Sequence, residues 1–206
     1  MKPMIFFDCG ANDGYSSVPI AEANPTARVF GFEPTPQLID IIQGKIVGLA
    51  NYTLVPVAVS NYTGRAEFNI SGNLDWGCSS LLPLSDDWEQ HWYGRTDMRV
   101  TETTMVDVIR LDSYIDLWAA DPIPYISFLH IDTQGSDLKV LEGLGRYVEI
   151  VEGGVMEAAT KPNVLYNGQN GVAESIEFLK QHGFLITNIQ VNDPANNEVN
   201  IEFMRA

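Results

Sequence analysis

Short apolar runs alternate with amphipathic segments along this chain, and this alternation limits the possible folds more than any other feature. Residues 4–9 and 28–33 are predominantly apolar, which is typical of strands buried on both faces of a sheet. Residues 36–48 carry apolar side chains at helical spacing. Strands that alternate with helices predict an α/β fold, in which helices cover both faces of a doubly wound, mostly parallel sheet.

The end of the chain departs from this alternation. Residues 184–191 and 199–204 are two successive strand patterns, which predict an antiparallel hairpin. We therefore expect a Rossmann-like, mostly parallel seven-stranded sheet with a C-terminal antiparallel hairpin. Turn-forming residues at 61–64 further predict that a strand at 65–70 folds back antiparallel to a third strand at 52–60.

Length and charge narrow the class of protein. The 206 residues fit one domain, 1–206, and the formal net charge of -15 repels nucleic-acid phosphates and anionic lipid headgroups. We therefore expect no nucleic-acid partner and no membrane association. The apolar runs are shorter than the ~20 residues that span a bilayer, and the two cysteines, Cys9 and Cys78, suit a reducing compartment. These features favour a cytoplasmic protein, and they leave its oligomeric state open.

The turn after the first strand is rich in glycine and acidic residues. It reads Asp8-Cys9-Gly10-Ala11-Asn12-Asp13-Gly14. Asn12 and Tyr15 stand where a dinucleotide-binding turn would have its second and third glycines. Because the carboxylates of Asp8 and Asp13 would repel a pyrophosphate, the cationic cofactor S-adenosylmethionine suits this turn better.

An acidic side chain also closes the second strand. Glu33 follows the turn by roughly 20 residues, the position from which a carboxylate accepts both hydrogen bonds of a ribose diol. The pattern thus predicts that the chain binds S-adenosylmethionine and its product S-adenosylhomocysteine. The predicted contacts are Asp8, Gly10, Asn12, Asp13, Gly14 and Glu33; the alternative is that Asp8 and Gly10 only form the turn and that Glu33 is a solvated strand end.

An ordered set of segments resembles the FkbM family of class I S-adenosylmethionine-dependent methyltransferases between residue 5 and about residue 157. The segments are Phe6-Phe7-Asp8-Cys9-Gly10-Ala11-Asn12-Asp13-Gly14, Val29-Phe30-Gly31-Phe32-Glu33-Pro34, Val57-Ala58-Val59-Ser60, Ser79-Ser80-Leu81, Ile109-Arg110-Leu111-Asp112 and Leu129-His130-Ile131-Asp132-Thr133-Gln134-Gly135-Ser136-Asp137. The resemblance implies methyl transfer, usually to a hydroxyl oxygen of a sugar or secondary metabolite. It also implies that Ser60 and Asp132 contribute to cofactor binding.

The motif after the fourth core strand departs from the family pattern. His130, Gln134 and Asp137 stand where the family often has a lysine and two glutamates, whereas Asp132 and Gly135 are retained. Asp132 is the first candidate for a catalytic base; the alternative is that it caps the following helix. His130 and Glu157 are further catalytic candidates, or else a packed histidine and a surface glutamate. Two carboxylates, Asp132 and Glu157, do not define a metal site, and we expect none.

Residues 72–99 lack any periodicity. A loop of this length in a compact domain is typical of a lid or a binding segment, and this one is rich in aromatic residues. We predict an insertion or lid at about 72–99 that lines the acceptor site, through Ser79, Ser80, Trp76 and Trp92. The alternatives are that the serines only fill the loop and that the tryptophans pack it against the domain.

The expected activity is O-methylation of a small-molecule acceptor, a sugar or secondary metabolite, with a peptide also possible. Two alternatives stay open. One is an N-methyltransferase acting on a small molecule or peptide, since an amine needs less help from a base. The other is a partner subunit that binds the cofactor without catalysis, because a fold and a cofactor pocket do not guarantee chemistry.

Overall fold

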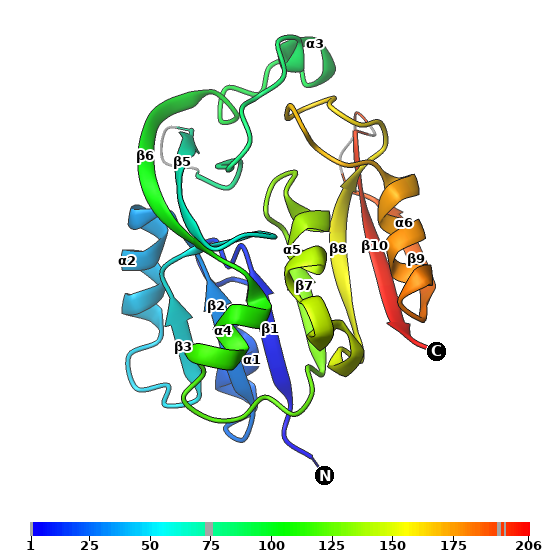
Figure 1. Cartoon of the computed structure of the whole chain (residues 1–206). Helices are drawn as coiled ribbons and strands as arrows, with labels where there is room; N and C mark the ends of the chain where they lie inside the picture. Colours follow the sequence, from blue (N-terminus) through cyan, green and yellow to red (C-terminus); the bar gives the residue numbers. More distant parts are fainter. Residues whose placement is uncertain (1, 73–75, 193–194, 196) are drawn as a thin grey trace.

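A computed structural model describes residues 2–72, 76–192, 195 and 197–206, and it has a seven-stranded sheet at its centre (Figure 1). The strand order is β3-β2-β1-β7-β8-β10-β9. The bounds are β1 Ile5–Cys9, β2 Arg28–Phe32, β3 Tyr52–Val55, β7 Phe128–Ile131, β8 Gly153–Ala159, β9 Phe184–Val191 and β10 Glu198–Arg205. The five neighbouring strands β3, β2, β1, β7 and β8 are parallel, and β10 runs antiparallel to both β8 and β9. The predicted fold class and C-terminal hairpin are confirmed.

Helices cover both faces of this sheet. On one face lie α1 (Val18–Ala23) and α2 (Pro36–Lys45); on the other lie α4 (Leu111–Leu117), α5 (Asp137–Gly143), the 3-10 helix Gly145–Ile150 and α6 (Val172–Gln181). The central strand β1 has a packed core on each of its two faces, which explains why residues 4–9 form a continuous apolar run. Phe6 packs under α1 and α2, whereas Phe7 packs on the opposite face with Tyr114 of α4.

The third predicted strand is interrupted, and its prediction as one strand at 52–60 is wrong. β3 ends at Val55, and β4 (Ala58–Val59) leaves the main sheet for a second, three-stranded sheet of order β4-β6-β5. Pro56 lies at the break and has no backbone N–H to donate to a neighbouring strand.

The partner predicted for the strand at 65–70 is also wrong. β5 (Gly64–Ser71) pairs antiparallel with β6 (Val100–Ile109) and not with residues 52–60. The ten-residue β6 offers β5 a ladder along its whole length, whereas the two-residue β4 could pair with only a fraction of it. The prediction of a turn at 61–64 was correct. The turn residues could not show that the strand that pairs with β5 is β6, which lies beyond the long segment that follows β5.

The segment predicted as an insertion connects β5 to β6; its residues 73–75 lie outside the described part of the chain. The N–H of Gly72 donates to the carbonyl of Arg99, so the two ends of the segment meet. The short helix α3 (Trp88–His91) lies above the carboxyl ends of the main strands, close to the loop before α6 (Figure 1). We call residues 76–99 together with residues 160–171 the cap.

The cap has a small core of its own. Met98, Val164, Leu165 and Tyr166 are buried, and Trp88 and Trp92 pack against them. Backbone hydrogen bonds run between the two cap segments, from Ser85 to Leu165 and from Asn167 to Pro83. Trp88 and Trp92 thus help to hold the two cap segments together.

A substitution at Gly10 tests how closely the first turn must approach β7. Gly10 has a φ of 85°, and a methyl group there would overlap the carbonyl oxygen of Asp132. We expect Gly10→Ala to lower the free energy of unfolding by about 2 to 4 kcal/mol in urea denaturation. The control is Gly44→Ala, since an added Cβ there meets nothing within 4 Å and alanine favours the helix by up to about 1 kcal/mol. Equal stability of the two variants would contradict the prediction.

Candidate functional site

The site is built on the turn that follows β1. The N–H groups of Gly10 and Ala11 both donate to the carbonyl of Phe32, at 3.0 and 2.9 Å, which brings the turn over the end of β2. Asn12 adopts a left-handed conformation, with a φ of 52°. Its N–H points to the carboxylate of Glu33, whose Oε2 accepts it at 2.9 Å.

Glu33 joins this turn to the start of α2. Its second oxygen, Oε1, accepts the N–H of Thr35, the residue before the helix, at 2.8 Å. Burial raises the pKa of Glu33 to about 7, despite these stabilising hydrogen bonds. An ionised carboxylate has about four acceptor positions, so acceptor capacity remains for a ligand.

Glu33 lines a cleft at the carboxyl ends of the strands. The space among its lining residues is about 510 Å³, a volume that includes open solvent. Residues from the first turn, the ends of β2 and β7, α2, the second sheet and the cap line it: Gly10, Asn12, Phe32, Glu33, Pro34, Thr35, Leu38, Ala58, Val59, Phe68, Trp76, Gly77, Ser79, Leu81, Asp132, Thr133 and Gln134.

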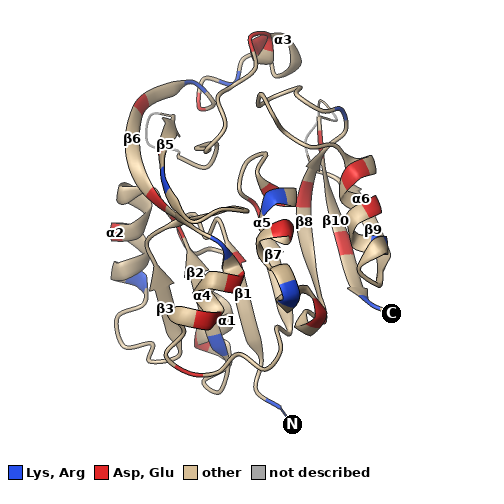
Figure 2. Cartoon of the chain, in the orientation of Figure 1, with Lys and Arg blue, Asp and Glu red and all other residues tan. Residues whose placement is uncertain are grey.

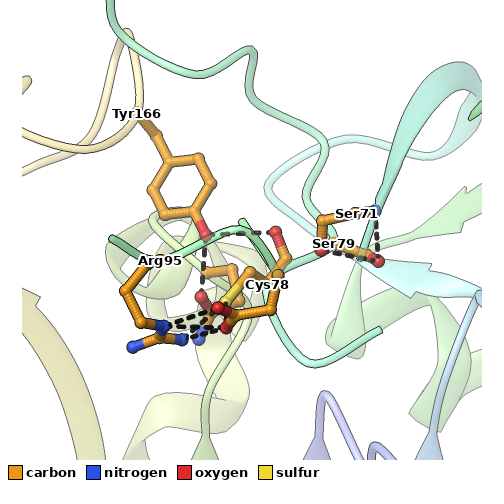
Figure 3. A network of polar contacts seen from close by, with 7 residues as sticks. Ser71, Cys78, Ser79, Arg95 and Tyr166 are labelled. Atoms are coloured by element: carbon orange, nitrogen blue, oxygen red, sulfur yellow. Dashed lines mark hydrogen bonds and ion pairs between the residues drawn. The ribbon is translucent and has the colours of Figure 1, made fainter. Parts of the chain in front are cut away.

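Asp132 lines this cleft, and its hydrogen-bond partner is Gln134. The side-chain amide of Gln134 donates to Asp132 Oδ1 at 2.6 Å and to Glu157 Oε2 at 3.2 Å. The hydroxyl of Tyr166 donates to the amide oxygen of Gln134 at 2.8 Å and lies 3.1 Å from the carbonyl of Cys78 (Figure 3). Tyr166 therefore orients the amide so that its N–H groups face the two carboxylates.

Both carboxyl groups hold protons more tightly than usual. Burial raises the pKa of Asp132, although the hydrogen bond from Gln134 and the nearby His130 oppose this shift. Burial, together with the charges of Asp132 and Glu198, raises the pKa of Glu157 well above its ordinary value. Asp132 lines the cleft, whereas Glu157 is not among the lining residues and reaches Asp132 through Gln134.

His130 lies beside Asp8 on adjacent strands. The Nδ1 of His130 is 2.6 Å from Asp8 Oδ1, and neither residue lines the cleft. Burial lowers the pKa of His130, but the hydrogen bond and charge of Asp8 outweigh it, so the pKa is raised above 6.5. The pair places a titratable cation next to a fully buried carboxylate.

A different acidic residue supports the turn after β7. Asp137 begins α5, and its carboxylate accepts the N–H groups of Thr133 and Gly135, at 3.0 and 3.1 Å. Burial raises its pKa to about 7. Asp132 instead accepts a hydrogen bond from Gln134, and the residue at the N-cap of α5 is Ser136.

The remaining predicted cofactor contacts lie apart from the cleft lining. Asp13 forms an ion pair with Lys45, at 2.7 Å. Gly14 has a φ of 80° and its N–H closes the turn onto Ala11, which gives it a structural role in shaping the loop. Ser60 is buried at the end of β4, where its backbone meets Gly143 of α5.

The four predicted acceptor contacts fall into different places. Trp76 and Ser79 line the cleft, and Ser79 accepts a hydrogen bond from the N–H of Ser71 (Figure 3). Ser80 lies next to the cleft and donates to the carbonyl of Gln134 at 2.6 Å. Trp92 lies in the cap core, and the guanidinium of Arg95 covers its ring.

Two contributors were missed from the sequence. Thr35 and Tyr166 both touch the network, and Tyr166 lies in a loop with neither periodicity nor a motif. For residues 72–99, the lack of periodicity together with large aromatic residues indicated a lid or binding segment. The same combination could have indicated that residues 160–171 contribute to the site.

Acidic residues are distributed over several elements of the chain. Figure 2 shows them on α4, α5 and α6 and on the neighbouring strands β8 and β10. Within the described ranges, no group of three or more histidine, cysteine or acidic residues is arranged to hold a metal ion. Nor does any helix in that part of the chain have the length and apolar character to cross a membrane.

The sheet order, with a cleft at the carboxyl ends of its parallel strands, is the class I methyltransferase fold. The crystal structure of Methyltransferase FkbM from Methylobacillus flagellatus KT matches 98% of this chain and 43% of its own, with a TM-score of 0.60 and 15% identity. Aeropyrum pernix fibrillarin in complex with natively bound S-adenosyl-L-methionine matches 98% of this chain and 66% of its own, with a TM-score of 0.54 and 11% identity.

The family follows from the sequence. The protein-family model for the Methyltransferase FkbM domain matches residues 8–186, and the chain belongs to this family. The 2-O-methyltransferase NoeI of Sinorhizobium fredii (strain NBRC 101917 / NGR234) is 26% identical over 146 residues, which cover 68% of this chain and 56% of NoeI. The chain thus spans little more than half the length of that relative.

The pair of Asp8 and His130 generates a prediction about pH. Because the folded pKa of His130 is raised, the pair stabilises the fold below about pH 6.5, and this contribution is lost as the pH rises through the raised value. We expect Asp8→Asn to lower the pKa of the imidazole, as measured by NMR titration of the histidine ring protons. A His130 titration that is the same in both proteins would show that Asp8 does not hold the proton.

Proposed function

We propose that this chain is an S-adenosylmethionine-dependent methyltransferase that methylates a hydroxyl oxygen of a small molecule, a sugar or secondary metabolite. The observation that carries the proposal is the cleft, which Glu33, Gly10 and Asp132 line together. The FkbM family supports methyl transfer, and the name of NoeI as a 2-O-methyltransferase supports oxygen as the acceptor atom.

The residues of the cleft fit this cofactor. Glu33 can accept the hydroxyl groups of a ribose, and Gly10 leaves the backbone free of a side chain beside Asp132. The hydroxyl of Thr133 is buried without a partner in the described chain, which leaves a hydrogen-bonding group for a ligand. S-adenosylmethionine supplies a methyl group activated by its sulfonium, and the carboxylate of Asp132, which lines the cleft, favours a cation beside it.

In this proposal Asp132 accepts the proton of the acceptor hydroxyl. An effective base has a pKa near the working pH, and burial shifts the pKa of Asp132 upward in that direction. Gln134 holds Asp132 in place through its amide. The remaining rate acceleration comes from positioning of the acceptor, because alignment of the reacting groups removes much of the entropic barrier.

Two other functions remain to be separated from this one by experiment. An N-methyltransferase would use the same cleft with less need for Asp132 as a base. A partner subunit without catalysis would bind the cofactor and transfer nothing. The acidic chain, with its net charge of -15, supports a small acceptor over a nucleic acid.

Glu33 provides the direct test of cofactor binding. We expect Glu33→Gln to raise the Kd for S-adenosylhomocysteine about 10- to 100-fold in isothermal titration calorimetry, because hydrogen bonds to a charged group contribute about 1.5–3 kcal/mol. The wild-type affinity should fall as the pH drops below about 7, since protonated Glu33 loses an acceptor, and the variant should lose the part of this dependence that comes from Glu33. Asp13→Asn is the matched control, because Asp13 is engaged by Lys45.

Asp132 provides the test of chemistry. Labelled S-adenosylmethionine is incubated with a panel of sugars, phenolic and other hydroxylated metabolites, amines and peptides. Transfer to an alcohol by the wild type should fall about 100- to 10,000-fold in Asp132→Asn, while the Kd for S-adenosylhomocysteine changes by less than tenfold. Transfer only to amines would favour the N-methyltransferase, and unchanged transfer by the variant would remove Asp132 as the base.

A further inference from the structure

Gln134, which bonds to both carboxyl groups of the site, is itself held by the two segments of the cap. The hydroxyl of Ser80 donates to its backbone carbonyl at 2.6 Å, and the hydroxyl of Tyr166 donates to its amide oxygen at 2.8 Å. Its backbone has a φ of 53°, in the left-handed region that L residues seldom adopt. The cap therefore fixes both the main chain and the side chain of the residue that contacts Asp132 and Glu157.

Tyr166 is a rigid and permanent donor. Its exposed fraction is 1%. The cap segments are joined on either side of it, because the N–H of Ser85 donates to the carbonyl of Leu165 and the N–H of Asn167 donates to the carbonyl of Pro83. Burial raises the pKa of the Tyr166 hydroxyl well above its ordinary value, so the hydroxyl keeps its proton at neutral pH.

The hydroxyl of Tyr166 has one proton and two acceptors beside it. The amide oxygen of Gln134 lies 2.8 Å away, and the carbonyl of Cys78 lies 3.1 Å away (Figure 3). When the hydroxyl donates to Gln134, the amide N–H groups face the carboxyl groups. When it donates to Cys78, its oxygen can accept an amide N–H, and the amide oxygen faces the carboxyl groups. Tyr166 therefore has a hydrogen bond for either orientation of the amide.

The two orientations of the amide suit opposite protonation states of Asp132. An ionised carboxylate only accepts hydrogen bonds, whereas a protonated one donates. The amide nitrogen of Gln134 lies 2.6 Å from Asp132 Oδ1, and a turn of the amide puts its oxygen in that place. Glu157 fits both orientations, since burial raises its pKa well above the ordinary value and a carboxylic acid can accept or donate. A glutamate at position 134 would have no N–H to offer the ionised form.

We propose that Tyr166 and Gln134 are positioning residues that keep Asp132 hydrogen-bonded both before and after it takes a proton from the acceptor hydroxyl. This inference rests on the proposed function, in which Asp132 is the base. While Asp132 is ionised, the amide donates to it. When the proton of the acceptor moves to Asp132, the amide turns, accepts the new O–H and donates to Tyr166, whose own proton turns to Cys78. Asp132 then releases its proton to water in the cleft.

Charged groups on four elements also act on Asp132. They are Asp8 of β1, His130 of β7, Asp137 of α5 and Glu157 of β8. Burial raises the pKa of Asp132, and the hydrogen bond from Gln134 lowers it. Every one of these charged groups is retained when Tyr166 loses its hydroxyl. A change in the titration of Asp132 in such a variant therefore reports the orientation of the amide.

The test is the titration of the Asp132 carboxyl by NMR, in the full chain labelled with carbon-13 at the aspartate carboxyl groups and assigned with Asp132→Asn. In Tyr166→Phe nothing holds the amide N–H toward Asp132, so its titration midpoint should rise by about 0.5 to 1 pH unit, the equivalent of one hydrogen bond. Gln134→Met should raise the midpoint at least as much, and adding Tyr166→Phe to Gln134→Met should change it no further. Tyr93→Phe is the matched control, because Tyr93 lies in the same cap and is 94% exposed.

Kinetics give a second measurement, with an alcohol acceptor identified by the labelled cofactor. A base must be ionised to accept a proton, so a raised pKa of Asp132 should move the acid limb of the kcat profile of Tyr166→Phe to higher pH by the same amount. The KM for the acceptor should stay within about twofold of the wild type, since Tyr166 is not among the residues that line the cleft.

Thermal unfolding checks that each variant is folded, and Gln134→Met keeps the test valid if Tyr166→Phe is unstable. An Asp132 midpoint that is the same in folded Tyr166→Phe and in the wild type, or that rises further in the double variant, would overturn the inference. If the wild type binds S-adenosylhomocysteine but methylates no acceptor, the proposed function fails and the catalytic part of this inference fails with it. The NMR titration decides the action of Tyr166 on Asp132 in either case.

Discussion

The close approach of the first turn to the end of β7 is the contact on which the site depends. Gly10 has no side chain, and its backbone lies directly against the carbonyl of Asp132. Its N–H and that of Ala11 both bond to Phe32, so the turn crosses from β1 over β2. The parallel strands β1, β2 and β7 thereby deliver residues at or after their carboxyl ends to a common cleft, because the carboxyl ends of adjacent parallel strands lie at the same edge.

Buried carboxylates surround this contact, and mostly neutral groups satisfy them. Backbone amides serve Glu33 and Asp137, and the side chain of Gln134 serves both Asp132 and Glu157. Neutral donors do not cancel the charge, so burial raises the pKa of each of these groups. Glu33 and Asp137 therefore have pKa values of about 7, and a cationic ligand gains from the carboxylates of the site that have released their protons.

The second sheet and the cap form walls of the cleft that the doubly wound sheet alone does not provide. β4 leaves the main sheet at Pro56, and β5 and β6 then extend beyond the carboxyl edge. The cap closes over this edge with its own core and reaches the turn after β7 through Ser80 and Tyr166. The same carboxylate network is thus supported by the sheet from below and by the cap from above.

The sequence by itself determined the parallel sheet, the C-terminal hairpin and the edge at which the site lies, because burial on two faces and turn chemistry are local properties of short segments. It also identified Gly10, Glu33 and Asp132, each of which directly ends or follows a strand. Tertiary structure decided the pairing of β5 with β6 and the contact of Tyr166 with Gln134. It likewise separated Trp76 in the cleft from Trp92 in the cap core. These choices join residues far apart in the chain, and no local pattern encodes them, since each partner is selected by which surfaces remain uncovered after the main sheet has formed.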